Sequence, residues 1–174
     1  VFMTGGTGFV GSLLTKNLTK HGHSVTLLTR RIRKNRPLPH GVLMVEGNPA
    51  KPGPWQEQVA DHEVIINLAG ASIFRRWTHS EKRLIHDSRI ETTRNLVNAL
   101  EARKGLKMTL LSTSAVGYYG FHGDETLNES SPPGKDFLAS VASKWEETAL
   151  RAAALGARVA LCRFGIVLGS EGGA

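Results

Sequence analysis

The stretch Thr4-Gly5-Gly6-Thr7-Gly8-Phe9-Val10-Gly11 decides how this chain folds. It follows a short apolar run, Val1 to Met3, and leads into a segment whose apolar residues recur at helical spacing. Its glycines Gly5, Gly8 and Gly11 fit the pattern G-x-x-G-x-x-G between a strand and a helix. Glycines at this spacing and in this context predict a turn that binds the pyrophosphate of a dinucleotide.

Each glycine of the turn has an expected task. Gly5 permits the tight turn, Gly8 lets the backbone approach a pyrophosphate, and Gly11 lets the helix and the strand pack closely. The helix that follows adds free N–H groups and the positive end of its dipole, and both favour an anion. Cofactor contacts are therefore expected along the whole turn, from Thr4, Gly5, Gly6, Thr7, Gly8, Phe9, Val10 and Gly11.

Strand and helix patterns alternate on the C-terminal side of this turn. Apolar runs typical of strands occupy residues 1–3, 25–28, 42–45, 64–68, 108–111 and 158–162, and helical spacing covers 9–18, 80–103 and 136–154. Strands separated by helices indicate βαβ units and a parallel sheet. Right-handed crossovers then predict one α/β domain over residues 1–174, a doubly wound Rossmann fold with strand order 3-2-1-4-5-6.

The end of the second predicted strand indicates which dinucleotide binds. Sites for NAD usually carry Asp or Glu there, to hold the ribose 2′-hydroxyl. Here the strand ends Leu28-Thr29-Arg30-Arg31, without an acid. Because arginine pairs with a phosphate through charge-assisted hydrogen bonds, we expect NADP, with Arg30 as the leading contact and Thr29 and Arg31 as helpers. The alternative is that one or both arginines point to water.

Much of the basic excess behind the net charge of +7 lies in one run, made of Arg30, Arg31, Arg33, Lys34 and Arg36. A nucleic-acid patch is one interpretation of such a run. However, no aromatic residues interleave with it and no nucleic-acid motif accompanies it. A solvated loop or a pocket for a phosphate fits better, so no nucleic-acid partner is expected.

The composition bounds the class of protein. With 40% hydrophobic and 21% charged residues, the 174-residue chain is typical of a soluble globular domain. No apolar run approaches the roughly 20 residues of a membrane-spanning helix, so no membrane partner is expected. The one cysteine, Cys162, cannot form an internal disulfide, and a reducing cytoplasm is the expected compartment. The seven histidines show no metal-ligand spacing, so no metal site is expected.

Further stretches carry a family resemblance: Asn67-Leu68-Ala69-Gly70, Arg76-Trp77-Thr78, Asp87-Ser88-Arg89-Ile90, Ser112 to Gly120 and Arg163 to Gly169. Together with the glycine turn they resemble the extended short-chain dehydrogenases/reductases. Within these, the chain is most similar to epimerase-like proteins labelled nucleoside-diphosphate-sugar epimerases or SulA-type cell-division inhibitors. The resemblance implies cofactor contacts from Leu68, Ala69 and Gly70 and an adenine contact from Asn48. It also implies a C-terminal substrate domain, which is expected to be missing here.

The resemblance implies an active site of Ser or Thr, Tyr and Lys, with the last two spaced Tyr-x-x-x-Lys on one face of a helix. The counterpart in this chain is Ser140-Val141-Ala142-Ser143-Lys144, in which serine replaces the tyrosine. A serine hydroxyl lacks the acidity of a phenol, which makes Ser140 a poor acid or base. The neighbouring Glu146 and Glu147 fit a solvated face of the same helix.

Other residues are left to supply the chemistry. Ser114 matches the family's catalytic hydroxyl, with a simple loop hydrogen bond as the alternative. Tyr118 or Tyr119 is the expected phenol, unless both pack against the nicotinamide side or the missing domain. Lys144 is expected to bind the nicotinamide ribose, unless it simply faces solvent.

The function expected from these residues is that of an NADP-dependent oxidoreductase or epimerase-like enzyme. Its expected substrate is a small polar molecule, with nucleotide sugars among the candidates. The alternative is a protein that binds NADP without turnover, as a redox sensor or regulatory partner. Ser140 at the tyrosine position favours this alternative, whereas the retained Ser114 and Lys144 favour the enzyme.

Overall fold

The computed structural model describes residues 1–32, 38–169 and 172–173 of the chain. Its strands are β1 (Phe2–Thr4), β2 (Val25–Thr29), β3 (Val42–Glu46), β4 (Val64–Asn67), β5 (Thr109–Ala115), β6 (Arg158–Phe164), β7 (Leu168–Gly169) and β8 (Gly172–Gly173). Its α-helices are α1 (Phe9–Lys20), α2 (Trp55–Val59), α3 (His79–Ala99) and α4 (Phe137–Leu150), with 3-10 helices at Leu100–Arg103, Val116–Tyr119 and Arg151–Leu155. Arg33, Lys34 and Arg36 of the basic run lie outside the described residues.

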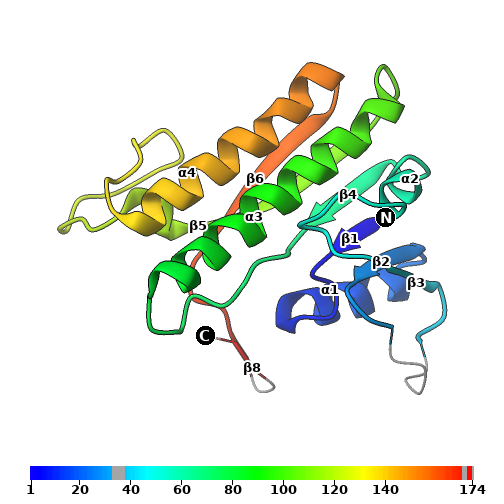
Figure 1. The fold of residues 1–174 in the computed structure, drawn as a ribbon, viewed down its shortest axis with the longest axis horizontal. Coiled ribbons are helices and arrows are strands. Elements are labelled where there is room, and N and C mark those ends of the chain that lie inside the picture. Colours follow the sequence, from blue (N-terminus) through cyan, green and yellow to red (C-terminus); the bar gives the residue numbers. More distant parts are fainter. Residues whose placement is uncertain (33–37, 170–171, 174) are drawn as a thin grey trace.

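Six of the strands form one parallel sheet in the order β3-β2-β1-β4-β5-β6, which confirms the predicted Rossmann topology (Figure 1). β1 pairs with β2 on one side and with β4 on the other, so the order reverses between β1 and β4. In such sheets the crevice for a ligand opens at this reversal, beyond the carboxyl ends of the strands. The glycine turn after β1 and the loop after β4 therefore border the same crevice.

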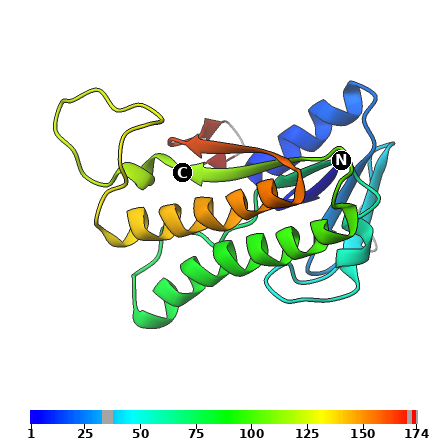
Figure 2. The same cartoon turned by 90° about the horizontal axis from the view of Figure 1, so that it is seen from above.

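The helices cover the two faces of the sheet unequally. α2, α3 and α4 lie on one face, and α1 lies on the other (Figure 2). Phe2 and Ile65 point towards the three helices, whereas their chain neighbours Met3 and Ile66 point to the α1 side. Since successive strand residues point to opposite faces, these two sets of side chains are the two sides of the same strands.

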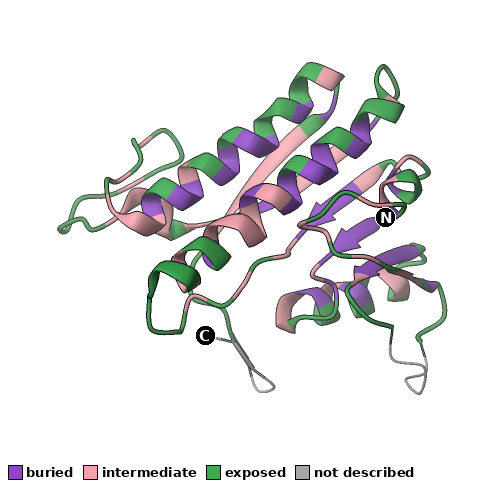
Figure 3. Cartoon of the chain, viewed as in Figure 1, coloured by how far each residue is buried: buried purple, intermediate pink, exposed green. Residues whose placement is uncertain are grey.

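The two long helices bury one side each. Their buried residues face each other and the sheet, and their exposed residues lie outside (Figure 3). Thr78 caps the start of α3 by accepting from the N–H of Glu81 (3.3 Å), and Asp136 caps α4 by accepting from the N–H of Ala139 (3.0 Å). Among the described residues, no helix has both the length and the apolar character needed to cross a membrane.

The elements differ from the sequence prediction in two respects. α2 falls in a segment without a predicted element, because five residues are too few for a helical period to be recognised. β5 and β6 run to Ala115 and Phe164, further than predicted, since their parallel pairing continues through small and polar residues that interrupt the apolar pattern. Ser114 therefore lies on a strand and not in a loop.

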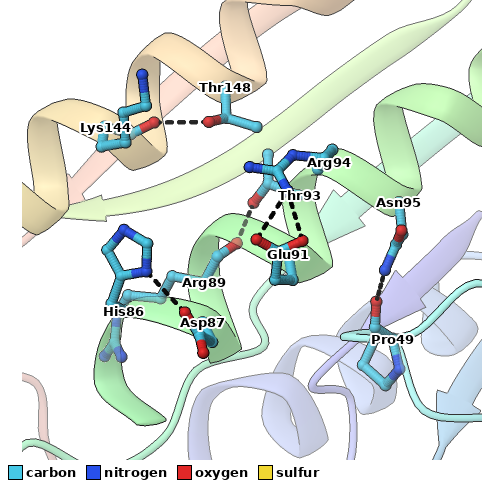
Figure 4. Close-up of polar contacts among 10 residues, drawn as sticks. All are labelled: Pro49, His86, Asp87, Arg89, Glu91, Thr93, Arg94, Asn95, Lys144 and Thr148. Atoms are coloured by element: carbon cyan, nitrogen blue, oxygen red, sulfur yellow. Dashed lines mark hydrogen bonds and ion pairs between the residues drawn. The ribbon is translucent and has the colours of Figure 1, made fainter. Parts of the chain in front are cut away.

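A buried polar network joins the sheet to both long helices. Thr4 Oγ1 donates to Asn67 Oδ1 (2.7 Å), and Asn67 Nδ2 donates to Thr93 Oγ1 on α3 (2.8 Å). Thr93 Oγ1 also accepts from Trp145 Nε1 on α4 (2.8 Å). It donates to the backbone carbonyl of Arg89 (2.8 Å), as Figure 4 shows. One hydroxyl thus satisfies three buried polar groups and ties β4, α3 and α4 together.

Thr93→Val should lower the free energy of unfolding by about 2–4 kcal/mol, because Trp145 Nε1 loses its buried acceptor and Asn67 Nδ2 keeps only its longer contact with Ser112 Oγ (3.4 Å). Thr148→Val is the matched control. Thr148 is also buried, but its hydroxyl only donates to the carbonyl of Lys144 (2.7 Å), so about 1 kcal/mol or less should be lost. Urea unfolding followed by circular dichroism measures both values. Equal losses in the two variants would contradict the role given to Thr93.

Candidate functional site

A cleft of about 370 Å³ opens at the carboxyl ends of the central strands. It runs from Val10, in the first turn of α1, past Leu68 and Gly70 after β4, to Ser114 near the end of β5. The helices that border it contribute Ile85 and Arg89 from α3 and Leu138, Val141, Ala142 and Trp145 from α4. The cleft therefore connects the glycine turn with Ser114, the predicted catalytic hydroxyl.

The turn between β1 and α1 has no room for a side chain at Gly5, Gly6 or Gly11, and at Gly6 the clash is with the side chain of Leu27. Gly5 has a φ of 69°, and a Cβ there would lie 2.6 Å from the carbonyl carbon of Leu68. A Cβ on Gly11 would lie 2.6 Å from the Cα of Gly6. Gly5 thus permits the tight turn as predicted, and Gly11 lets the first turn of α1 approach the backbone that leaves β1.

The N-terminus of α1 offers a place for an anion. Gly8 is the N-cap in an extended conformation, and a Cβ there would meet the carbonyl oxygen of Gly5 at 3.3 Å. No hydrogen bond among the described residues uses the N–H groups of Phe9, Val10 or Gly11, and the first turn of the helix holds no acidic residue. These N–H groups and the helix dipole together favour a phosphate.

The remaining residues of the turn have different positions. Thr7 is exposed beside Gly8, whereas Gly6 is buried beneath the turn. Thr4 is fully buried, and its hydroxyl donates to Asn67. The side chain of Thr4 therefore supports the turn from inside the sheet.

The end of β2 presents two exposed arginines, Arg30 and Arg31. Thr29 Oγ1 accepts from the N–H of Arg31 (3.5 Å) and donates to its carbonyl (3.2 Å), which shapes the backbone there. Glu46, at the end of β3, accepts from the N–H of Ile32 (3.0 Å). Within the described part of the chain neither arginine pairs with a carboxylate, so both side chains are available to a phosphate.

Asn48 lies in the turn after β3, next to the end of β2. Gly47 donates its N–H to the carbonyl of Thr29 (2.8 Å), which holds this turn beside β2. Asn48 Oδ1 accepts from the N–H of Ala50 (3.1 Å). The side-chain oxygen of Asn48 thus closes the turn, and its amide nitrogen is the group left for an adenine.

Ser114 and Glu146 form a buried pair beside the cleft. Ser114 Oγ donates to Glu146 Oε1 at 2.5 Å. Glu146 is 5% exposed, so the solvated face expected for it is wrong, although its neighbour Glu147 is exposed as expected. The reason is helical geometry, because successive residues of α4 point about 100° apart and Glu146 is turned to the sheet.

Arg163 of β6 balances the charge of this buried carboxylate. Its Nε and Nη2 donate to the two oxygens of Glu146, both at 2.8 Å. Arg163 is the register partner of Ser114 in the sheet, so the two side chains stand on the same face. The hydrogen bonds to Glu146 raise the pKa of Arg163 above its usual value.

Tyr118 and Tyr119 lie against Arg163. Tyr119 Oη accepts from Arg163 Nη1 (2.8 Å), and the Arg163 guanidinium lies 3.7 Å from the centre of the Tyr118 ring. Neither tyrosine is among the residues that line the cleft. The contacts between these rings and Ser114 run through Arg163 and Glu146.

Lys144 lies on the outer side of α4. Its Nζ donates to Glu147 Oε2 (2.8 Å), and Figure 4 shows the amine pointing away from α3. This hydrogen bond lowers the pKa of Glu147. Lys144 and Ser140 border a separate surface groove together with His86. The structure therefore does not bring Lys144 together with Ser114.

The face of α4 that borders the cleft is apolar. Leu138 and Ala142 stand on it four residues apart, which is the spacing expected of the tyrosine and the lysine. The predicted motif begins two residues later, at Ser140. Two residues turn a helix by about 200°, so the predicted motif faces away from the cleft.

Sequence reasoning missed Glu146, Arg163 and Arg89 as site residues. Arg89 and Arg163 fall in stretches that carry the family resemblance, but their sequence positions do not say what they contact. The Glu146–Arg163 pair becomes visible once the register places Arg163 beside Ser114. That register follows from the pairing of β5 with β6, and the apolar runs in these two segments are too short to predict it.

The chain belongs to the NAD dependent epimerase/dehydratase family, whose sequence profile matches residues 1–173. Epimerase family protein YfhF of Bacillus subtilis is 38% identical over 173 residues, which are 99% of this chain and 56% of that protein. The nucleoside-diphosphate sugar epimerase of Corynebacterium glutamicum superposes with a TM-score of 0.80 and 35% identity, over 99% of this chain and 35% of that one.

The structure of human epimerase family protein SDR39U1 with NADPH is also similar. It superposes with a TM-score of 0.76 and 30% identity, over 99% of this chain and 56% of the human one. This chain thus spans about half the length of YfhF and of the human protein.

Arg163→Met should cost about 3–5 kcal/mol of unfolding free energy, because it leaves the carboxylate of Glu146 buried without its cation. Arg151→Met is the matched control. Arg151 pairs with Glu147 on the exposed side of α4 at 3.5 Å, so its loss should cost about 0–1 kcal/mol. Urea unfolding at neutral pH measures both. A loss for Arg163→Met no larger than that of the control would show that the Glu146 pair is not buried in solution.

Proposed function

We propose that this protein is an NADP-dependent oxidoreductase or epimerase-like enzyme, and that residues 1–174 act as its dinucleotide-binding domain. The observation that carries the proposal is the single cleft of about 370 Å³ that connects the glycine turn with Ser114. A dinucleotide in this cleft has its phosphates at the start of α1 and its reactive end at β5, in line with ligand positions in doubly wound sheets.

The residues present fit a phosphorylated dinucleotide. At Gly5 and Gly11 the turn has room for the backbone but not for a side chain. The N–H groups of Phe9, Val10 and Gly11, which no described residue uses, suit a pyrophosphate. Arg30, with Thr29 and Arg31, would hold the 2′-phosphate that distinguishes NADP from NAD. Leu68, Ala69 and Gly70 would border the cofactor beyond β4, and the amide nitrogen of Asn48 would meet the adenine. When bound, the nicotinamide supplies a donor or acceptor of hydride.

Ser114 and Glu146 are the groups placed to move a proton beside the cofactor. Because Ser114 gives its proton to Glu146 Oε1, its oxygen can accept a hydrogen bond from a substrate hydroxyl in the cleft. A proton leaving that hydroxyl would pass through Ser114 Oγ to the carboxylate. The bidentate contact from Arg163 keeps the carboxylate oriented towards Ser114.

The other predicted catalytic residues take less direct parts in this proposal. Tyr118 and Tyr119 would act through Arg163, which both rings contact, and not as the phenol that meets the substrate. Lys144 would need to leave Glu147 and cross to the other side of α4 to reach a nicotinamide ribose. We therefore place the proton chemistry on Ser114 and Glu146.

The relatives support the cofactor and the substrate class. The human relative of 30% identity is described with NADPH, and the relative from Corynebacterium glutamicum is described as a nucleoside-diphosphate sugar epimerase. By analogy, the substrate proposed here is a small polar molecule, with nucleotide sugars as the first candidates. No nucleic acid or membrane has a part in this proposal.

A second candidate function is NADP binding without turnover, as a sensor or regulatory protein. Leu138 and Ala142 favour it, since they stand where the family's acid/base pair would face the cleft. Among the described residues that line the cleft there is no tyrosine and no lysine. Two assays separate the two functions: loss of NADPH absorbance on addition of ketones or aldehydes, which reports net reduction, and conversion of a nucleotide sugar to its epimer followed by NMR, which consumes no cofactor. A sensor gives neither result.

Arg30→Ala should weaken NADPH binding by roughly 1–3 kcal/mol, the scale of a charge-assisted hydrogen bond, and leave NADH binding unchanged. The unsubstituted protein should bind NADPH more tightly than NADH. Arg158→Ala is the control, because Arg158 is equally exposed but lies at the start of β6, away from the cleft. Isothermal calorimetry with both cofactors measures these affinities. Equal affinity for NADPH and NADH would rule out the part given to Arg30.

Gly8→Val should abolish NADPH binding and leave the domain folded. A Cβ at Gly8 meets one protein atom, the carbonyl oxygen of Gly5 at 3.3 Å, which has to move by a few tenths of an ångström. The extended backbone of Gly8 suits any residue, so the variant should still fold. The added side chain would instead occupy the path of the pyrophosphate. Calorimetry measures binding, and thermal unfolding by circular dichroism checks the fold. A folded variant that still binds NADPH would show that the turn is not the phosphate site.

A further inference from the structure

Arg89 is a positively charged residue held inside the cleft. It extends from α3, and its Nη1 donates to the carbonyl of Ile85 (3.1 Å). Its guanidinium lies 5.4 Å from the centre of the Trp145 ring, and a Cβ on Gly70 would lie 3.1 Å from its Cζ. These contacts with α3, α4 and the loop after β4 hold the guanidinium in a fixed place on the cleft wall (Figure 4 shows Arg89 on α3).

The charge of Arg89 has no counterpart among the described residues. No ion pair there involves Arg89, and the bond to Ile85 is the one hydrogen bond that uses its five N–H donors. Burial lowers the pKa of Arg89 below its usual value, which reflects the cost of taking this charge out of water. A half-buried charge that has no counterion in the described part of the protein is typical of a residue that binds an anionic ligand.

Arg163, the neighbour of Ser114 in the sheet, differs from Arg89 because it already holds an anion. Arg163 holds a carboxylate through two hydrogen bonds of 2.8 Å, and that carboxylate accepts from Ser114 as well. Glu146 is therefore already engaged. None of the described residues that line the cleft is Asp or Glu, so a negative charge for Arg89 has to arrive with the molecule that fills the cleft.

We propose that Arg89 binds an anionic oxygen group, a phosphate or a carboxylate, of a molecule held in the cleft between Gly70 and Ser114. This inference rests on the proposed function, because it assigns the cleft to the cofactor and its substrate. The anion comes either from the dinucleotide's own phosphates or from an acid group of the substrate. In both cases a planar guanidinium presents paired donors to paired oxygens.

Calorimetry on three proteins tests the proposal: the unsubstituted chain, Arg89→Gln, and Arg83→Gln, which removes the same charge from an exposed position on α3. The first titration uses NADPH. The second adds inorganic phosphate or malonate to the protein saturated with NADPH. A loss of about 30-fold or more in NADPH affinity, confined to Arg89→Gln, assigns the anion to the cofactor. A similar loss of phosphate or malonate binding, with NADPH affinity unchanged, assigns it to the substrate.

Two further measurements separate a loss of anion binding from a loss of folding. Arg89→Gln loses its contacts with Ile85 and Trp145 as well as its charge, so its melting temperature serves to show that it is folded during the titrations. Arg89→Lys keeps the charge and should retain part of the anion affinity. Unchanged affinity for NADPH, phosphate and malonate in Arg89→Gln would overturn the proposal. If the unsubstituted protein does not bind NADPH, the proposed function fails, and the phosphate and malonate titrations on the free protein then test Arg89 independently.

Discussion

The carboxamide of Asn67 fixes the geometry on which the cleft depends. Asn67 ends β4 at the reversal of strand order, and a carboxamide can accept and donate at the same time. It accepts from Thr4, just before the glycine turn, and donates to Thr93 on α3. Thr93 in turn holds Trp145 of α4. Buried polar groups need hydrogen-bond partners, so these contacts have to form together. They fix the positions of the glycine turn and of the two helices that border the cleft.

This arrangement distributes charge along the cleft in a way that suits an anionic ligand. Glu146 neutralises the charge of Arg163, which in turn holds this carboxylate beside Ser114. Arg89, in contrast, lines the cleft and has no ion pair with a described residue. Arg30 and Arg31 stand exposed at the end of β2, and α1 points its N-terminus at the crevice. Arg89 is thus the one arginine among the described residues that line the cleft, whose wall on α4 is apolar. An apolar wall excludes water and strengthens the interaction of Arg89 with an anion in the cleft.

The sequence predicts the fold well because its signals are local. The glycine spacing, the apolar runs and the helical periods each depend on a few neighbouring residues, and the rules for parallel sheets convert them into one strand order. The candidate site is predicted less completely. The Tyr-x-x-x-Lys comparison selects Ser140 and Lys144, but a motif does not determine which face of α4 meets the sheet, and packing turns that pair outward. The buried Glu146–Arg163 pair depends on the register of two strands, which no local pattern contains.

A map of NADPH contacts by NMR on the isotope-labelled protein shows where the cofactor lies. If the cofactor lies in the cleft, NADPH should shift the amide signals of Phe9, Val10 and Gly11 most, with further shifts at Gly70 and Ala115. The groove beside Ser140 and Lys144 should remain unchanged. Shifts confined to that groove, with the signals of the glycine turn unmoved, would mean that NADPH binds outside the cleft.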